Sequence, residues 1–285
     1  MTPKRRHGPH SPISELSRNA RIILMVRAAA VAVIRGVSDG FSKALARTPV
    51  PLNVARAKLQ HKAYVQAMAA RVSEVLQVPA APDLADCVFI EDVAVCVGSQ
   101  IVLTRPGAPS RRDEVAGLAA VLQTERFRAL PGAWSLTEME DEGATVDGGD
   151  VLVTDQHCFV GLSSRTNLAG LRCLQRLLAP QLPAGAESVL GIEVLDDLHL
   201  KSIATHAGGG QLAVHDSRGG AHFRETVDAL LGASSHGYTL HMMPHEAANV
   251  VRVGPYLLVA EECGRMPEVQ RLAKAAGVHV SNGTL

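Results

Sequence analysis

Apolar residues recur at two different spacings along the chain, and these spacings predict strands and helices in turn. Val31–Ile34 is a short, unbroken apolar run, which is typical of a buried strand. From Ala55 to Val78 the apolar residues, Leu59 and Leu76 among them, recur at the spacing of one helix face. The first part of the chain is therefore predicted to hold a strand followed by a long helix.

The next segment predicts a hairpin and then a helix. Val88–Val97 and Gln100–Thr104 are apolar stretches of strand length, and Gly98–Ser99 between them supplies a turn. We expect a helix from Ser110 to Leu122, because a serine followed three residues later by an acid is a capping-box pattern. Such a pair satisfies free N–H groups in the first turn of a helix.

The order strand, turn, strand and helix recurs around residues 88–122 and 151–178 and, in part, around 256–276. The units differ in sequence, so the predicted repeat is one of structure. No long Pro/Gly/Ser-rich linker interrupts residues 45–285, and we expect one mixed α/β domain over residues 26–285. The later elements expected are strands at Val151–Val153, Cys158–Gly161, Tyr256–Ala260 and Val278–Val280, and helices at Thr166–Leu178 and from Pro267 to Gly277.

Composition excludes several classes of partner. Hydrophobic residues make up 47% and charged residues 20% of the 285, which is ordinary for a soluble globular protein. Lys+Arg and Asp+Glu both count 28, so the basic excess of a typical nucleic-acid binder is missing. The apolar run Ile22–Ile34 contains Arg27 and is too short to span a membrane. We expect neither nucleic acid nor a membrane as a partner.

Cysteine usage and the basic first segment bear on the compartment. The five cysteines form no CxxC pair, so neither a disulfide framework nor a zinc ribbon is indicated, and a reducing, cytoplasmic location is expected. Met1–Arg21 is basic and poor in acids. It reads as a disordered tail or an extension ahead of a start at Met25, or as an organelle-targeting peptide.

Two pairs of acids and one histidine lie in apolar surroundings. Glu91 and Asp92 interrupt an apolar stretch, where ionised carboxylates are costly to bury without a cationic partner. The plainer interpretation is that one faces solvent and the other pairs with an arginine. Asp147 and Asp150 flank two glycines, an arrangement that allows close approach of a ligand but also forms ordinary turns.

His199 lies between two leucines, where it is either a general acid or base or a packed, hydrogen-bonded core residue. His245 and Glu246 do not begin a zinc-protease motif, because Asn249 stands where the second histidine is needed.

Five blocks combine these charged residues with their neighbours. They are Asp86–Asp92, Thr104–Arg112, Ala144–Leu152, Phe159–Asn167 and Leu198–Ser202. Taken in order, they resemble the dimethylarginine dimethylaminohydrolase family, and the resemblance extends from about Val26 to Ser281. Several blocks in register are far more specific than any one of them.

The resemblance implies a pentein-type α/β propeller of five ββαβ units, with the last unit incomplete. It implies hydrolysis of asymmetric dimethylarginine or monomethylarginine to citrulline and a methylamine, without a cofactor or metal. By motif match, His199 is the general acid and base, and Asp147 faces the guanidinium. The residues that match substrate-holding positions are Leu45, Asp86, Glu91, Asp92, Arg111 and Arg165.

The family's cysteine nucleophile lies near its C-terminus, and no cysteine follows Cys263 in this sequence. Cys263 follows two glutamates, which oppose thiolate formation. Cys87 is next to Asp86, and adjacent strand residues point to opposite faces. We therefore expect either an incomplete gene product, with an open sheet edge, or a catalytically inactive homologue that binds arginine-like ligands. An arginine deiminase on the same fold is a third, weaker alternative.

Overall fold

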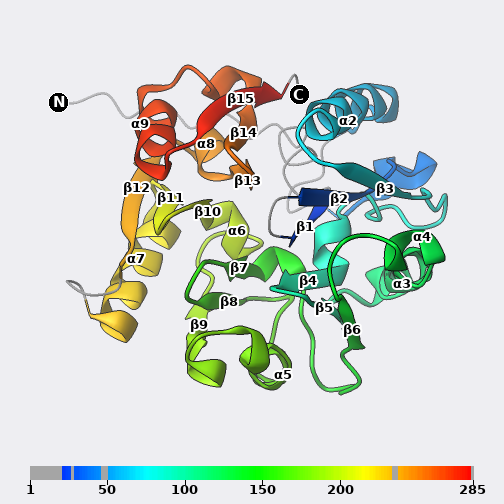
Figure 1. The fold of residues 1–285 in the computed structure, drawn as a ribbon, viewed down its shortest axis with the longest axis horizontal. Coiled ribbons are helices and arrows are strands. Elements are labelled where there is room, and N and C mark those ends of the chain that lie inside the picture. Colours follow the sequence, from blue (N-terminus) through cyan, green and yellow to red (C-terminus); the bar gives the residue numbers. More distant parts are fainter. Residues whose placement is uncertain (1–20, 27–28, 46–50, 233–236, 284–285) are drawn as a thin grey trace.

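Five three-stranded sheets surround a common centre in the computed structural model, which describes residues 21–26, 29–45, 51–232 and 237–283 (Figure 1). In each sheet two antiparallel strands are followed by a third strand that pairs in parallel with the second. The sheets are β1 (Arg21–Val26), β2 (Ala29–Arg35) and β3 (Glu74–Val78); β4 (Ala94–Val97), β5 (Gln100–Leu103) and β6 (Ser135–Glu138); β7 (Val151–Val153), β8 (Cys158–Leu162) and β9 (Val189–Glu193); β10 (Ala204–Gly208), β11 (Gln211–His215) and β12 (Thr239–Met243); and β13 (Val251–Val253), β14 (Tyr256–Ala260) and β15 (His279–Gly283).

A helical crossover joins the second and third strands of every unit, because parallel neighbours cannot be linked by a tight turn. These helices lie on the outside of the ring (Figure 1). Four of them begin at side-chain caps, in which Asn53, Thr124, Asn167 and Ser217 accept backbone N–H bonds of the first turn. The crossover helices are α2 (Val54–Ala69), α3 (Glu114–Leu122) with α4 (Glu125–Arg128), α5 (Leu168–Leu178), α7 (Arg218–Leu231) and α9 (Pro267–Ala276).

Short helical turns near the centre carry the residues of the candidate site. Four of them precede the first strand of a unit and the fifth, η3, follows β5, so their side chains meet around the axis of the ring. The turns are η2 (Ile90–Val93), η3 (Pro109–Arg111), η4 (Gly148–Asp150), α6 (Leu200–Ile203) and α8 (His245–Ala248).

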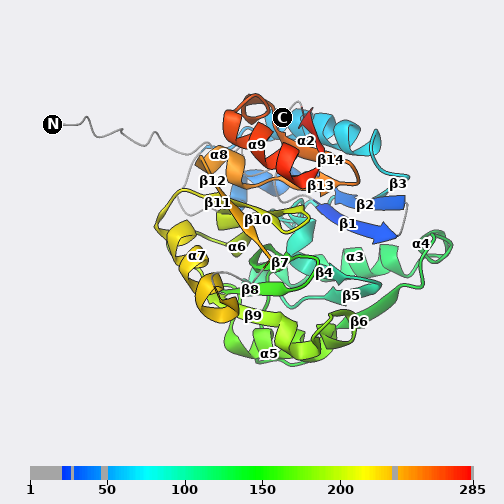
Figure 2. The ribbon, with the colours of Figure 1, turned by 60° about the vertical axis from the view of Figure 1, so that its left-hand side comes forward.

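Apolar contacts between neighbouring units close the ring. One buried cluster joins Ala32, Tyr64 and Met68 of the first unit to Val253 and Leu258 of the fifth. Figure 2 shows the same neighbourhood, with α2 beside the fifth sheet. The first and fifth units therefore share a buried core where they meet.

The predicted α/β propeller is confirmed, but four of its elements were wrongly bounded. The helix predicted over Ala55–Val78 ends at Ala69, and Glu74–Val78 forms β3. Parallel pairing with β2 buries Leu76 and Val78, a tertiary effect that outweighs helical spacing. The strand predicted over Val88–Val97 is confined to its last four residues, because η2 occupies Ile90–Val93.

The capping box at Ser110 is also wrong. Ser110 lies inside η3, and α3 begins only at Glu114, after Asp113, whose side chain makes no capping bond. The delay places Arg111 in the interior, where it binds Glu114. The helix predicted from Thr166 begins at Leu168.

The fifth unit is not incomplete. β15 pairs with β14 from Tyr256↔His279 to Ala260↔Gly283, which gives this sheet the same three strands as the others. The strand edge that we expected to be open is thus covered. At the other end, β1 begins at Arg21, ahead of the predicted domain start. The prediction of a disordered tail, an extension or a targeting peptide over residues 1–20 lies outside the described residues. None of the helices in the described part of the chain combines the length and apolarity needed to cross a membrane.

The contact between the first and fifth units predicts a large effect of trimming Met68. Met68 is fully buried in the shared cluster, and Met68→Ala should lower the free energy of unfolding by about 2–5 kcal/mol. Leu59→Ala on the same helix is the matched control, because Leu59 is 70% exposed and should change stability by less than about 0.5 kcal/mol. Urea unfolding measures both. Equal effects of the two substitutions would show that the ring is not closed through this cluster.

Candidate active site

One pocket at the centre of the ring collects six of the eight residues predicted for the site. They come from the segment after η1 (Asp39–Lys43), the turn before η2, η2 itself, η3, the loop after β8 and the turn before α6, which are far apart in sequence. The pocket is lined by Leu45, Asp86, Phe89, Asp92, Arg111, Arg165, Leu198, His199, Ser202, His245 and Asn249.

Arg111 is the centre of a buried ion cluster. Its Nη1 donates to Asp92 Oδ2 at 2.5 Å, its Nη2 donates to Glu114 Oε2 at 2.8 Å, and its Nε donates to Glu114 Oε1 at 3.1 Å. Nη2 also donates to the carbonyl oxygens of Asp86 and Phe89. Most of the donors of this guanidinium are thus engaged within the protein, so Arg111 holds Asp92 in place.

The pKa values within this cluster follow from burial and charge. Burial alone would raise the pKa of Asp92, but Arg111 and then His199 outweigh it, so the pKa lies below its usual value. Burial raises the pKa of Glu114 despite its bonds to Arg111. Asp92 is therefore a permanently ionised group at the pocket wall, and its Oδ1 also accepts the N–H of Gly149 at 2.8 Å.

His199 lies among three carboxylates. Its Nδ1 is 3.4 Å from Asp150 Oδ2, and its Nε2 is 3.8 Å from Asp147 Oδ2 and 4.0 Å from Asp92 Oδ1. Burial opposes the charged form, but the carboxylates outweigh burial and raise the pKa of His199 to about 9. The imidazole is thus a cation at neutral pH. A Cβ on Gly149 would lie 2.9 Å from the ring, so only glycine fits against it.

Asp150 is a site residue that the sequence analysis did not select. Its Oδ2 accepts the hydroxyls of Ser163 and Thr166, each at 2.7 Å, and its Oδ1 accepts the N–H of Leu200 at 3.0 Å. These donors fix the carboxylate that orients His199. The sequence feature that could have identified Asp150 is its position after the two glycines that follow Asp147.

Asp147 is fully buried behind the pocket wall. Its Oδ1 accepts the N–H of Gly107 at 2.8 Å, while its Oδ2 lies 3.5 Å from Arg165 Nη1 and accepts no hydrogen bond from the described residues. Burial, and after it the charge of Asp92, raises the pKa of Asp147 to about 6. This carboxylate oxygen is therefore available to a cationic ligand.

Leu45 and Asp86 lie together at the rim. The backbone N–H of Leu45 donates to both carboxylate oxygens of Asp86, at 3.0 and 3.2 Å, and the Leu45 side chain is 45% exposed. Burial raises the pKa of Asp86, against the opposing effect of Arg111. The rim thus offers a carboxylate beside an exposed apolar side chain.

Glu91 is placed outside the pocket. Its Oε2 accepts Lys201 Nζ at 2.9 Å, and both side chains line a separate channel of about 690 Å³ along the centre of the ring. η2 thus turns the two adjacent acids to opposite sides, with Asp92 toward the pocket and Glu91 toward the channel.

Five lining residues were not predicted. Leu198 and Ser202 belong to the block around His199, and Phe89 belongs to the block around Asp92, so their positions in those blocks were the available signal. His245 and Asn249 come from α8 and the residue after it, and no motif marked them as part of this site.

Two groups of side chains have ligand atoms close enough together to hold a metal ion. Asp92, Asp147 and His199 offer ligand atoms within 4.8 Å of one another, and so do Asp197, His215 and His245. Arg111 and Arg165 already neutralise the first group, which opposes a further divalent charge. The described residues of the pocket therefore suit an organic cation better than a metal ion.

No described residue that lines the pocket is a cysteine, although all five cysteines of the chain lie in described segments. Burial raises the pKa of both Cys96 and Cys158 to about 12. Cys87 is buried with a raised pKa, and Cys263 is packed in the core beneath α9. A reactive thiol needs exposure and positive neighbours, and these four lack one or both.

Comparison with known proteins agrees with the geometry. A family model described as arginine deiminase matches residues 45–223. A dimethylarginine dimethylaminohydrolase of Streptomyces coelicolor is 37% identical over 187 residues, covering 61% of this chain and 68% of that protein. The Pseudomonas aeruginosa protein of the same name is 32% identical, with 59% of this chain and 61% of that protein covered. A bovine protein named putative hydrolase DDAH2 is 31% identical, with 76% and 72% covered.

Solved structures show the same fold. A mutant of the Pseudomonas aeruginosa enzyme complexed with citrulline superposes with a TM-score of 0.69 at 22% identity, covering 89% of this chain and 92% of that one. The N-terminal domain of a cyanobacterial arginine dihydrolase, bound to its substrate, gives a TM-score of 0.65 at 16% identity, covering 89% and 90%. Together with the sequence relatives, these matches confirm the predicted family: the chain belongs to the arginine deiminase family and, within it, to the dimethylarginine dimethylaminohydrolases.

Proposed function

We propose that the pocket binds Nω-methylated arginine, as asymmetric dimethylarginine or monomethylarginine, and belongs to a hydrolase that converts it to citrulline and a methylamine. The observation that carries the proposal is that ionised Asp92 and charged His199 line one pocket, with the buried carboxylate of Asp147 directly behind them, 3.8 Å from His199 Nε2. A methylated guanidinium is a planar cation with N–H donors, and carboxylates bind it through charge-assisted hydrogen bonds. Relatives named for this reaction support the choice of substrate.

The substrate cation would take the place that Arg165 holds beside Asp147. Oδ2 of Asp147 faces Arg165 at 3.5 Å, with no hydrogen bond from any described residue. A guanidinium bound there releases Arg165, which then pairs with the substrate's own carboxylate. We assign the substrate amino group to Asp86 and Leu45 at the rim. Arg111 contributes its positive charge and the position of Asp92, and Glu91 supports the wall from the channel side through Lys201.

His199 would move the proton in both halves of the reaction. In the first half a thiolate attacks the guanidinium carbon, the C–N bond to the methylated nitrogen breaks, and the His199 proton goes to the departing amine. In the second half the neutral imidazole takes a proton from water, the hydroxide attacks the same carbon, and the carbon–sulfur bond breaks to release citrulline. Asp150 holds the ring in place throughout by its contact with Nδ1.

A second function, binding without turnover, is favoured by the placement of the cysteines. No described lining residue supplies the thiolate that the first half of the reaction requires. In this alternative the chain recognises arginine-like cations through the same carboxylates and releases them unchanged.

One pair of measurements on purified residues 1–285 separates these functions. Isothermal titration with asymmetric dimethylarginine, arginine and lysine tests recognition, and citrulline release from each guanidine tests turnover. Binding with citrulline release supports the hydrolase, and binding without release supports the second function. Faster turnover of plain arginine would indicate a deiminase. If no guanidine binds more tightly than lysine, the proposed ligand class is wrong.

Asp147→Asn should weaken binding of asymmetric dimethylarginine about 10- to 100-fold at pH 7.5, because a charge-assisted hydrogen bond contributes about 1.5–3 kcal/mol. Since the pKa of Asp147 is raised to about 6, binding by the unaltered chain should also weaken as the pH falls through 6. The variant should lack that step. Asp113→Asn, at an exposed carboxylate without a capping bond, is the matched control and should bind as the unaltered chain does. Isothermal titration from pH 5 to 8 measures both effects.

The charged state of His199 should also make stability depend on pH. Its folded-state pKa of about 9 exceeds the ordinary value of about 6.5. Its stabilisation is therefore complete below pH 6.5 and is lost as the pH rises through 9, by about 3 kcal/mol at most. Asp147 titrates below this range and does not contribute to the change.

Urea unfolding at pH 6.5, 8 and 10 tests this dependence. The unaltered chain should lose more stability across that range than His199→Asn, in which the titrating ring is absent. His279→Asn, at an exposed histidine of β15, should follow the unaltered chain. Parallel pH profiles for the unaltered chain and His199→Asn would contradict the assignment of a charged imidazole.

A further inference from the structure

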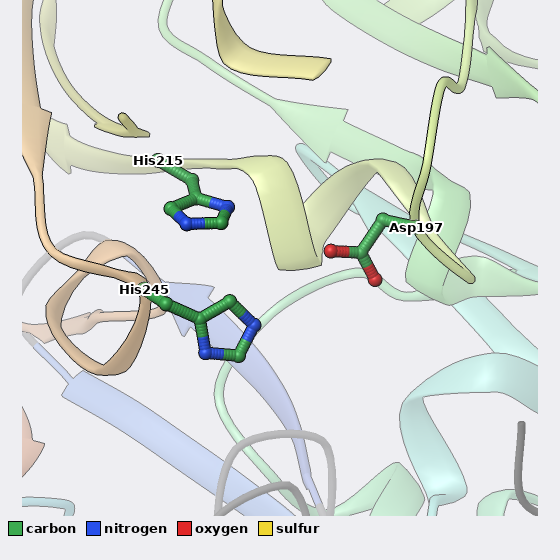
Figure 3. A group of neighbouring side chains, drawn as sticks. All are labelled: Asp197, His215 and His245. Carbon is green, nitrogen blue, oxygen red and sulfur yellow. The ribbon is translucent and has the colours of Figure 1, made fainter. Parts of the chain in front are cut away.

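Two histidines and one aspartate from three different elements meet beside the pocket (Figure 3). Asp197 lies in the turn between β9 and α6, His215 is the last residue of β11, and His245 is the first residue of α8. Each offers one ligand atom, and these atoms lie within 4.8 Å of one another. Figure 3 shows the two imidazole rings close together, with the carboxylate of Asp197 directed toward them.

The backbone around these residues is firmly held. His215 pairs with Met243 in the parallel register of β11 and β12, and the N–H of Asp216 donates to the carbonyl of Met243 at 2.9 Å. Pro244 then opens α8, which places His245 across from His215, with ring centroids 4.7 Å apart. The N–H of Leu198 donates to Asp197 Oδ1 at 2.7 Å. The three side chains are thus presented by a fixed framework, and none of them is fully buried.

Two imidazoles and one carboxylate form a ligand set that suits zinc and related first-row divalent cations. In a tetrahedral zinc site with bonds of about 2.0–2.1 Å, ligand atoms lie roughly 3.3 Å apart. The ligand atoms of this group lie within 4.8 Å of one another, and rotation of the partly exposed side chains can bring them to that spacing. With three protein ligands, one coordination position is left for water.

We propose that Asp197, His215 and His245 form a binding site for a zinc-class divalent cation at the rim of the pocket. His245 itself lines the pocket, as does Leu198 next to Asp197, and His199 follows two residues after Asp197. A cation bound here ties the turn that carries His199 to the wall formed by α8. Cation binding at this site does not depend on the identity of the pocket's ligand.

The other group of potential ligands makes a sharp comparison. Asp92, Asp147 and His199 are all buried and are accompanied by Arg111 and Arg165. The rim group consists of one carboxylate and two imidazoles, all of them partly exposed. Substitutions in the rim group are therefore expected to weaken binding of the cation, and substitutions in the pocket group are not.

The test is a titration of the full chain with Zn²⁺ after treatment with a strong chelator. At pH 7.5, competition with a chromogenic chelator should show one equivalent bound with a micromolar or tighter dissociation constant. His215→Gln, His245→Gln and Asp197→Asn should each weaken binding at least tenfold. Asp197→Asn retains an oxygen for the Leu198 N–H, so it separates loss of a ligand from loss of the turn. Co²⁺ in place of Zn²⁺ should give visible absorption bands that these variants lose.

Two control variants make the result decisive. His279→Gln, at the exposed histidine of β15, and His199→Asn, in the pocket, should bind Zn²⁺ as tightly as the unaltered chain does. Zn²⁺ should raise the melting temperature of the unaltered chain and of both controls, but not that of the three rim variants. Loss of binding in His199→Asn with retention in the rim variants would assign the cation to the pocket and overturn the proposal. Absence of any stoichiometric Zn²⁺ binding would overturn it as well.

Discussion

The bond between Asp92 and Arg111 is the interaction on which the rest of the centre depends. A buried carboxylate and a buried guanidinium are both costly to remove from water, and each is tolerable only because the other is present. Arg111 distributes its remaining donors over Glu114 and two carbonyl oxygens, which fixes η2 and η3 relative to α3. Loss of either partner would leave an uncompensated charge in the interior and would release these turns together.

Asp92 also connects neighbouring units. One of its oxygens binds Arg111 of its own unit, and the other accepts the N–H of Gly149 in the third unit. His199, from the fourth unit, lies 4.0 Å from that same second oxygen. The negative charge that raises the pKa of the imidazole is thus the same charge that fixes the loops around it. Structure and acid–base chemistry at this centre have a common electrostatic origin.

The identity of the charged residues could be predicted from the sequence, whereas the directions of their side chains could not. Glu91 and Asp92 were both assigned to the substrate, but the turn of η2 sends Glu91 into the channel toward Lys201. The plainer interpretation of that pair, one acid bound to an arginine, is correct for Asp92. Asp150 was missed because its importance comes from Ser163 and Thr166, donors that only the folded chain brings near it. Likewise β3 was predicted as part of a helix, because the spacing of its apolar residues is helical and its pairing with β2 is a tertiary interaction that local spacing does not reveal.

The two glycines between Asp147 and Asp150 make the main chain itself a wall of the site. A Cβ on Gly148 would lie 2.0 Å from the carbonyl oxygen of Glu91, and one on Gly149 would lie 2.6 Å from Asp92 Oδ1. Neither clash can be relieved without moving an acid of the centre. In a survey of all single substitutions, these two positions would therefore be as intolerant as the acids and His199, although they contribute no side chain to the chemistry. At this site a substitution can be harmful either because it removes a reacting group or because it adds atoms where the fold leaves no room for them.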